Sequence, residues 1–155
     1  MQLDPQMLAV MKKRATLTRE TDDLAALSIE EIREVYNAER AWWNEIKPEM
    51  HDVSELSIPG PVREVPVRIY KPLNASDGPT LLYLHGGGWV VGNLDTHDRV
   101  MRLLADFSSA HVVGVDYALS PEYKFPVAIN EAQAVIEWLQ AKGESCGLDS
   151  SRLGI

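Results

Sequence analysis

The sequence predicts an α/β fold, in which a mostly parallel sheet begins with an antiparallel hairpin and carries helices on its faces. Short apolar runs alternate with stretches of helical periodicity after residue 78, the pattern typical of strand-helix-strand units. Before residue 48, only helical periodicity occurs. We therefore expect a helical segment over residues 1–47, and the sheet with its flanking helices over residues 48–155.

The composition limits the classes of function. Of the 155 residues, 45% are hydrophobic and 25% are charged, which is typical of a single globular domain. The formal net charge of −8 argues against nucleic acid or an anionic membrane as partner, because like charges repel. The sequence shows one cysteine, no secretory leader pattern and no apolar run of about 18 residues. We expect a cytoplasmic protein that acts on a small molecule.

Two helices are predicted in the first segment. The first is expected over Pro5 to Leu17. Ser28, with Glu31 three residues later, forms a capping box and indicates the start of the second. Apolar side chains then recur at helical spacing and predict one covered face, formed by Ile32, Val35, Tyr36, Trp42, Trp43 and Ile46.

The second segment begins with a period of two. Two such runs flank Pro59-Gly60-Pro61, which predicts a hairpin of half-buried strands. In the second run, Val65, Val67 and Ile69 alternate with polar or proline positions. Because Pro66 has no N–H group to donate, we expect its strand to lie at an edge of the sheet.

Strands and helices then alternate. Buried strands are predicted over TLLYLH (residues 80–85) and HVVGVDYAL (residues 111–119), and SRLGI (residues 151–155) begins another. Helices are predicted over Thr96 to Ser109, with Asp95 as N-cap, and over Val127 to Lys142. The apolar face of the helix after Asp95 is assigned to Val100, Leu103, Leu104 and Phe107. This alternation implies parallel strands with helices on the faces of the sheet.

The pattern Gly-x-Ser-x-Gly at residues 143–147 raises the question whether Ser145 is a nucleophile. Such a serine must stand on a sharp turn that leads from a strand into a helix. Here the pattern follows a helix and precedes a strand, which is the reverse order. We therefore interpret Gly143 as a helix C-cap with positive φ, and Ser145 and Cys146 as a surface connection.

A triplet of glycines, residues 86–88, follows the buried strand within the motif HGGGW. Without Cβ atoms, the N–H groups of such a loop can turn toward a bound anion and approach it closely. The anion could be the oxyanion of an acyl-transfer intermediate or a phosphate. A dinucleotide-binding loop would have the pattern G-x-G-x-x-G, but position 91 is Val and Gly92 comes one residue late.

Acidic residues around His97 in LDTHD raise the question of a metal site. Helix capping and complementarity to the helix dipole explain two carboxylates at a helix start more simply. We expect neither a metal ion nor a cofactor.

Three stretches carry a resemblance to a known family: LYLHGGGWVVGNLDTHDR (residues 82–99), VVGVDYALSPEYKFPVAINEA (residues 112–132) and SRLGI. They are similar to the first half of α/β-hydrolase esterases of the hormone-sensitive-lipase family, in particular bacterial acetyl esterases. The resemblance implies a partial α/β-hydrolase fold, with residues 1–47 as a helical cap segment. Residues 48–155 would form the N-terminal half of the core, ending at the strand before the nucleophile elbow.

The resemblance also implies roles for the HGGGW residues. The N–H groups of Gly87 and Gly88 would form the oxyanion hole, with Gly86 allowing close approach. His85 would brace the loop, and Trp89 would border the acyl pocket. The family's usual Tyr-Arg-Leu-Ala-Pro-Glu string is YALSPE here, so Ala118 replaces the arginine and leaves any contact of that arginine without its usual donor.

The implied activity is hydrolysis of short-chain carboxylic esters by a serine, histidine and aspartate triad. By family position all three would lie after Ile155, so we expect the chain alone to be inactive. The expected partners are a small-molecule ester and either a second copy or the missing C-terminal half. The alternatives are a non-catalytic truncated module or assembly partner and, fitting the motif less well, a dinucleotide-binding domain.

Overall fold

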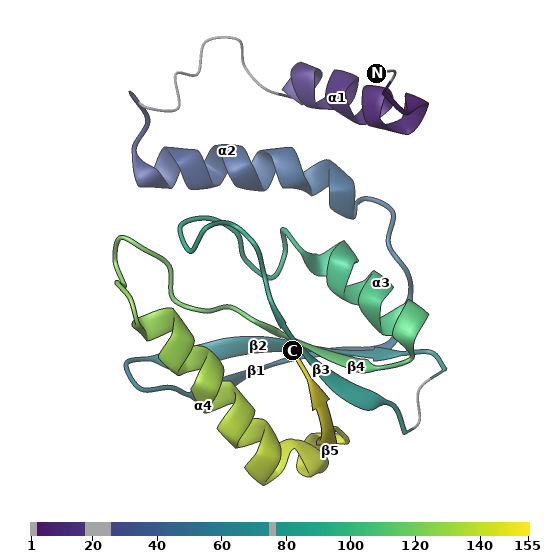
Figure 1. Ribbon diagram of the computed structural model, residues 1–155, viewed down its shortest axis with the longest axis vertical. Helices are drawn as coiled ribbons and strands as arrows, with labels where there is room; N and C mark the ends of the chain where they lie inside the picture. Colours follow the sequence, from purple (N-terminus) through teal and green to yellow (C-terminus); the bar gives the residue numbers. More distant parts are fainter. Residues whose placement is uncertain (1–2, 18–25, 75–76) are drawn as a thin grey trace.

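A computed structural model describes residues 3–17, 26–74 and 77–155. Helices and short 3₁₀ turns alternate with five strands along these residues (Figure 1). The helical elements are α1 (Pro5–Leu17), α2 (Ile29–Ala41), η2 (Trp42–Asn44), α3 (Asp98–Ser108), α4 (Val127–Lys142) and η3 (Gly143–Cys146). The strands are β1 (Met50–Pro59), β2 (Glu64–Pro72), β3 (Pro79–Leu84), β4 (His111–Val115) and β5 (Asp149–Gly154).

The strands form a mixed sheet in the order β1-β2-β4-β3-β5. β1 and β2 form an antiparallel hairpin, and β2 also runs antiparallel to β4. β3 pairs in parallel with β4 and with β5. The predicted fold class is therefore confirmed: parallel strands joined through helices, preceded by an antiparallel hairpin.

Helices cover both faces of the sheet (Figure 1). α3 contacts β2 and β4 from one face, and α4 contacts β1 and β5 from the other. α2 lies above the loops that follow β3 and β4, and α1 stacks on α2 at the end of the molecule farthest from the sheet. Within the three described ranges, no helix combines the length and apolar character needed to cross a bilayer.

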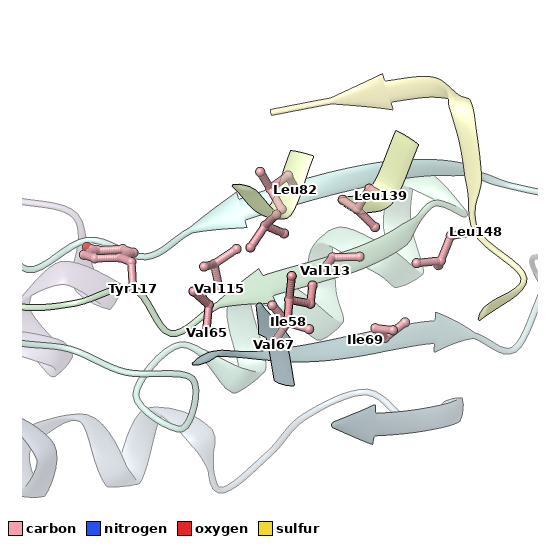
Figure 2. Packing of buried hydrophobic residues seen from close by; sticks show 11 residues of the cluster. Ile58, Val65, Val67, Ile69, Leu82, Val113, Val115, Tyr117, Leu139 and Leu148 are labelled. Atoms are coloured by element: carbon pink, nitrogen blue, oxygen red, sulfur yellow. The ribbon is translucent and has the colours of Figure 1, made fainter. Parts of the chain in front are cut away.

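The main core lies between the sheet and α4 (Figure 2). Val65, Val67 and Ile69 of β2 all point into it, as their predicted alternation requires. Tyr70 of the same strand points to the opposite face and packs with Met101 of α3. The main core is completed by Ile58, Leu82, Val113, Val115, Tyr117, Val135, Leu139 and Leu148.

Pro66 does not lie on an edge strand, and that prediction was wrong. β2 lies between β1 and β4. Its pairing with β4 ends at Val67 and Val115, however, so Pro66 stands one residue beyond the ladder on that side. The carbonyl of Pro66 accepts from the N–H of Asp116 at 2.9 Å. Because a residue's N–H and C=O point to the same neighbouring strand, the missing N–H leaves the Asp116 carbonyl without a donor from Pro66, and that carbonyl accepts from Arg63 instead.

α3 begins later and faces differently than predicted. Its N-cap is His97, not Asp95, and Asp95 instead accepts from Arg68 at 2.8 Å. The buried residues of the helix are Asp98, Met101 and Ala105. Phe107, predicted to be on the covered face, is 81% exposed. The helix turns this way because Asp98 joins an ionic cluster with Lys47 and Arg102 beneath it.

The ends of the helices test three further expectations. The capping box is confirmed, since Ser28 Oγ accepts from the Glu31 N–H at 3.2 Å and the Glu31 carboxylate accepts from the Ser28 N–H at 2.8 Å. Ile46, however, is 82% exposed, because the chain has left the helix by then. Gly143 has φ −56° and is right-handed, and the positive φ falls on Gly147.

Candidate active site

The glycine loop leaves the carboxyl end of β3, next to the loop that leaves β4. Because β3 and β4 are parallel, both loops emerge at the same edge of the sheet. Ser120 of the second loop donates its N–H to the Trp89 carbonyl at 2.7 Å, and Tyr117 donates its hydroxyl to the His85 carbonyl. Ligand sites of open α/β sheets lie at this edge.

His85 is buried and supports the start of the glycine loop. Its Nδ1 lies 3.0 Å from the Gly86 carbonyl, which can only accept, so Nδ1 carries the proton of the neutral ring. The ring stacks on Tyr117 at a centroid distance of 4.3 Å. Burial lowers the pKa of His85. Its Nε2 is buried without a partner among the described residues.

Hydrogen bonds orient both peptide units of the glycine loop. The Gly87 carbonyl accepts from the N–H groups of Val90 and Val91, each at 3.1 Å. In a planar trans peptide, the N–H points opposite to the carbonyl, so the Gly88 N–H points out of the loop. In the same way, the Gly86 carbonyl faces His85 and leaves the Gly87 N–H on the opposite side. Neither N–H donates to an acceptor within the described ranges.

The backbone conformation of this loop requires glycine at position 87. Its φ is +138°, and a Cβ there would lie 1.9 Å from the Val91 carbonyl oxygen. Gly88 has φ +61°, and a Cβ there would meet nothing within 4 Å. The loop is therefore closed on the side of Gly87 and open on the side of Gly88.

An apolar pocket of about 340 Å³ opens beside Gly88. Trp89, with φ 60°, stands at its rim and is 62% exposed. The other lining residues come from the loop after β4 and the start of α4, and include Tyr123, Phe125, Pro126 and Ile129. The residues of the HGGGW motif thus lie together in one loop. The buried side of the loop contains His85, and the opposite side faces this pocket.

Arg33 of α2 contacts both loops and was not identified from the sequence. Its Nε donates to the Val90 carbonyl at 2.9 Å, and its NH2 group donates to the Ser120 carbonyl at 2.8 Å. Both terminal nitrogens also pair with the Glu122 carboxylate at 2.8 Å. The sequence around Arg33 predicts only an amphipathic helix. No local pattern indicates that its guanidinium contacts residues far away in the chain.

A second arginine occupies the neighbourhood where the family's usual arginine is absent. Glu131 is fully buried, and its carboxylate accepts from Arg63 at 2.9 Å and from the Ala118 N–H at 2.7 Å. Arg63 also donates to the Asp116 carbonyl. The position of Glu131, four residues before Val135 on the buried face of α4, indicates a buried carboxylate but does not identify Arg63 as its partner.

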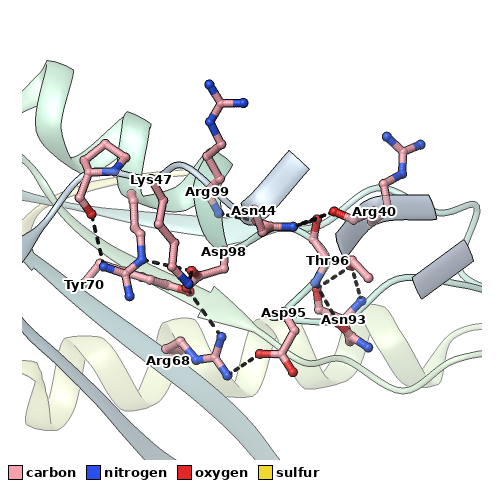
Figure 3. A network of polar contacts seen from close by, with 12 residues as sticks. Arg40, Asn44, Lys47, Arg68, Tyr70, Asn93, Asp95, Thr96, Asp98 and Arg99 are labelled. Carbon is pink, nitrogen blue, oxygen red and sulfur yellow. Dashed lines mark hydrogen bonds and ion pairs between the residues drawn. The ribbon is translucent and has the colours of Figure 1, made fainter. Parts of the chain in front are cut away.

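A larger cavity, of about 560 Å³, lies elsewhere, between η2, β2 and α3. Its polar groups are paired with one another (Figure 3). The buried Asp98 accepts from Tyr70, Lys47 and Arg102, and Arg68 pairs with Asp95. Although burial opposes it, these donors hold the pKa of Asp98 below its usual value. Over the described ranges, no three His, Cys, Asp or Glu side chains gather as metal ligands would.

Ser145 lies far from this arrangement in the fold. It is exposed in η3, after α4 and before β5, which confirms the predicted order of helix, turn and strand. Its hydroxyl donates to the Lys142 carbonyl at 2.7 Å. The hydroxyl is therefore used in closing the end of a helix and has no histidine among its hydrogen-bond partners.

Known proteins resemble the chain in sequence and in structure. The α/β-hydrolase fold family matches residues 81–155. Acetyl esterases of Salmonella paratyphi A and Salmonella agona are each 42% identical over 126 residues, which is 81% of this chain and 38% of theirs. The chain thus spans well under half the length of these curated relatives.

Solved esterases superpose on almost the whole chain. The hyperthermophilic esterase of the archaeon Pyrobaculum calidifontis does so with a TM-score of 0.83 at 32% identity, over 99% of this chain and 48% of its own. An ester hydrolase from the metagenome of Lake Arreo has a TM-score of 0.86 at 34% identity, over 99% of this chain and 50% of its own. The chain therefore has part of the α/β-hydrolase fold, and the proteins that it resembles in sequence and in structure are esterases.

Proposed function

We propose that this chain is the oxyanion-hole half of a serine carboxylesterase that hydrolyses acetyl and other short-chain esters. The observation that carries the proposal is the orientation of the glycine loop. The Gly86 and Gly87 carbonyls are held within the protein, and the N–H groups of Gly87 and Gly88 have no acceptor among the described residues. Free amides in a loop that borders a pocket at Gly88 can stabilise the negative charge that develops on an ester carbonyl oxygen.

The pocket beside Gly88 favours an apolar acyl group over a charged one. Its lining is aromatic and aliphatic, and its volume of about 340 Å³ is large enough for a short acyl chain. In the proposed enzyme, Trp89 borders this pocket, and His85 braces the loop through the Gly86 carbonyl. Residues 1–47 serve as a cap segment over residues 48–155.

The chemistry requires a serine, a histidine and an aspartate from sequence outside these 155 residues. The serine attacks the ester carbonyl, and the histidine takes its proton and later gives it to the leaving alcohol. The amides of Gly87 and Gly88 bind the oxyanion in between. The additional length of the esterase relatives would provide the three residues.

The partner that fits this proposal is the C-terminal half of such an enzyme. β5 is the last strand of the described sheet and is paired on one side only. An unpaired edge can accept a further strand from another polypeptide. The same edge also leaves room for the second candidate, a non-catalytic module that assembles with another chain or with its own copy.

Hydrolysis of a short-chain nitrophenyl ester by a chimera tests the proposal. The chimera joins this chain to the C-terminal part of a Salmonella acetyl esterase, which supplies the triad. We expect saturable turnover by the chimera and none by the 155-residue chain alone. Ser145→Ala should leave the rate of the chimera unchanged, because that hydroxyl closes a helix end.

Two outcomes would contradict the proposal. A folded, monodisperse chimera without turnover would favour the non-catalytic module. Saturable hydrolysis by the isolated chain, abolished by Ser145→Ala, would show that the nucleophile had been wrongly excluded.

A further inference from the structure

We propose that Arg33 is a positioning residue, which holds the glycine loop in the conformation that aims the Gly88 N–H out of the protein. The catalytic meaning of this inference rests on the proposed esterase function. Its structural content does not, because it concerns only contacts within this chain.

The first step is the set of acceptors around the guanidinium. Arg33 donates to the Val90 carbonyl of the glycine loop and to the Ser120 carbonyl of the loop after β4. The same guanidinium makes a two-point contact with Glu122. Four hydrogen bonds to three residues fix both its position and its plane, which a lysine ammonium cannot reproduce.

The second step leads from Val90 to the oxyanion amide. The Val90 N–H and the Val91 N–H both donate to the Gly87 carbonyl. Holding the Val90 carbonyl from outside therefore limits rotation of the turn that clamps Gly87. Because the Gly87–Gly88 peptide is planar, the direction of the Gly88 N–H is fixed together with the Gly87 carbonyl.

The third step is that, among the described residues, no group other than Arg33 donates a hydrogen bond to the Val90 carbonyl. The loop after β4 contacts the glycine loop through the Ser120 N–H and the Trp89 carbonyl at 2.7 Å. Arg33 takes no part in that hydrogen bond. It links the two loops a second time, by donating to the Ser120 and Val90 carbonyls. The side chain is 24% exposed, so these charged hydrogen bonds are partly shielded from water.

The electrostatics support a persistent contact. The hydrogen bonds from Arg33 lower the pKa of Glu122 to about 2, so the carboxylate stays ionised at neutral pH. The pKa of Arg33 is raised by the same partner. α2 itself is fixed at its start by the capping box of Ser28 and Glu31. The contact thus makes α2 a support for the candidate site.

Nuclear magnetic resonance on the full 155-residue chain tests the inference without any activity. In Arg33→Lys we expect the Gly88 amide resonance to shift. Hydrogen exchange at the Val90 and Val91 amides should accelerate by roughly tenfold or more, since each charged hydrogen bond contributes to loop protection. Arg33→Gln, which also removes the charge, should show the same changes at least as strongly.

Arg102→Lys is the matched control. Arg102 also pairs with a carboxylate, that of Asp98, and with a backbone carbonyl, that of Pro48, but it contacts neither loop. Its substitution should leave the Gly88 resonance and the exchange of Val90 unchanged. Exchange of the Val113 amide in the core reports the stability of the sheet and should stay unchanged in the Arg33 variants.

The inference is overturned if Arg33→Lys and Arg33→Gln both leave the Gly88 resonance and the Val90 exchange as they are. It is equally overturned if exchange rises everywhere in both variants or both fail to fold, since Arg33 would then stabilise the fold in general. Failure of the esterase proposal appears separately, as a chimera that folds without turnover while the loop of this chain still responds to Arg33.

Discussion

At the scale of single residues, Gly87 and Gly88 occupy different surroundings within one motif. A side chain on Gly87 would overlap the carbonyl oxygen of Val91, a residue of the turn that orients the loop. A side chain on Gly88 would project into open space, and its only cost would be the left-handed backbone. The two glycines therefore serve separate purposes: one allows the turn to close, and the other leaves the side that faces the pocket free.

Substitution by alanine should separate these purposes. We expect Gly87→Ala to disrupt the loop, with loss of the protected Val90 and Val91 amides. Gly88→Ala should keep the loop and cost about 1–2 kcal/mol of stability, the usual cost of a left-handed alanine. Hydrogen exchange and urea unfolding measure both effects. Equal loop disruption in the two variants would mean that the open side of Gly88 is in fact filled.

His97 gives a pH dependence at the same scale. Burial and the nearby His85 ring, 5.3 Å away between centroids, lower the pKa of His97 to about 4. Because the unfolded chain binds the proton more tightly, the contribution of neutral His97 to stability is complete above about pH 6.5. It is lost as the pH falls from there toward 4, and burial of His85 acts in the same direction.

His97→Gln should therefore flatten the dependence of stability on pH between 6.5 and 4. Urea unfolding of the two proteins at several pH values in that window provides the measurement. An unchanged slope would show that His97 is protonated as easily in the folded chain as in the unfolded chain.

At the scale of elements, the sequence predicted the bounds of α1 and α4 to the residue. It failed for α3, where the charged Asp98 determines which face is turned inward. It failed for Pro66 because the sequence of β2 does not show where the neighbouring strand β4 ends. Contacts between distant elements override local pattern in both cases.

The corrected face of α3 makes a prediction about stability. Met101 is fully buried against Tyr70, whereas Phe107 is largely exposed. Met101→Ala should cost about 2–5 kcal/mol of unfolding free energy. Phe107→Ala should stay within about 0.5 kcal/mol of the unaltered chain, as exposed positions usually do. Urea unfolding compares them, and a larger loss for Phe107→Ala would mean that the outer face of α3 is covered in solution.

In the candidate site, too, local patterns could be predicted from the sequence, whereas contacts between distant residues could not. The HGGGW residues are contiguous, so a loop able to bind an anion could be predicted from the glycines and from the preceding strand, whereas the esterase role came from the family resemblance. Arg33 and Arg63 act across long separations in the chain, through carbonyls and carboxylates that only the fold brings near.

At the scale of the whole molecule, the sheet, α3 and α4 are arranged as in esterases twice as long. The described sheet positions the glycine loop and the loop after β4, both of which line the pocket, while α2 contacts the glycine loop through Arg33. In the proposed enzyme, this portion supplies electrostatic stabilisation and acyl binding, and the remaining portion supplies the nucleophile and its base. Neither portion would catalyse turnover by itself.

The most direct measurement of the central claim removes a single N–H group. Replacing Gly88 by glycolic acid in the chimera changes that amide to an ester and deletes the N–H without adding a side chain. We expect kcat for a short-chain nitrophenyl ester to fall by about a hundredfold to a thousandfold, the usual cost of one lost oxyanion donor, with KM little changed. An unaltered kcat would show that negative charge develops somewhere other than at this loop.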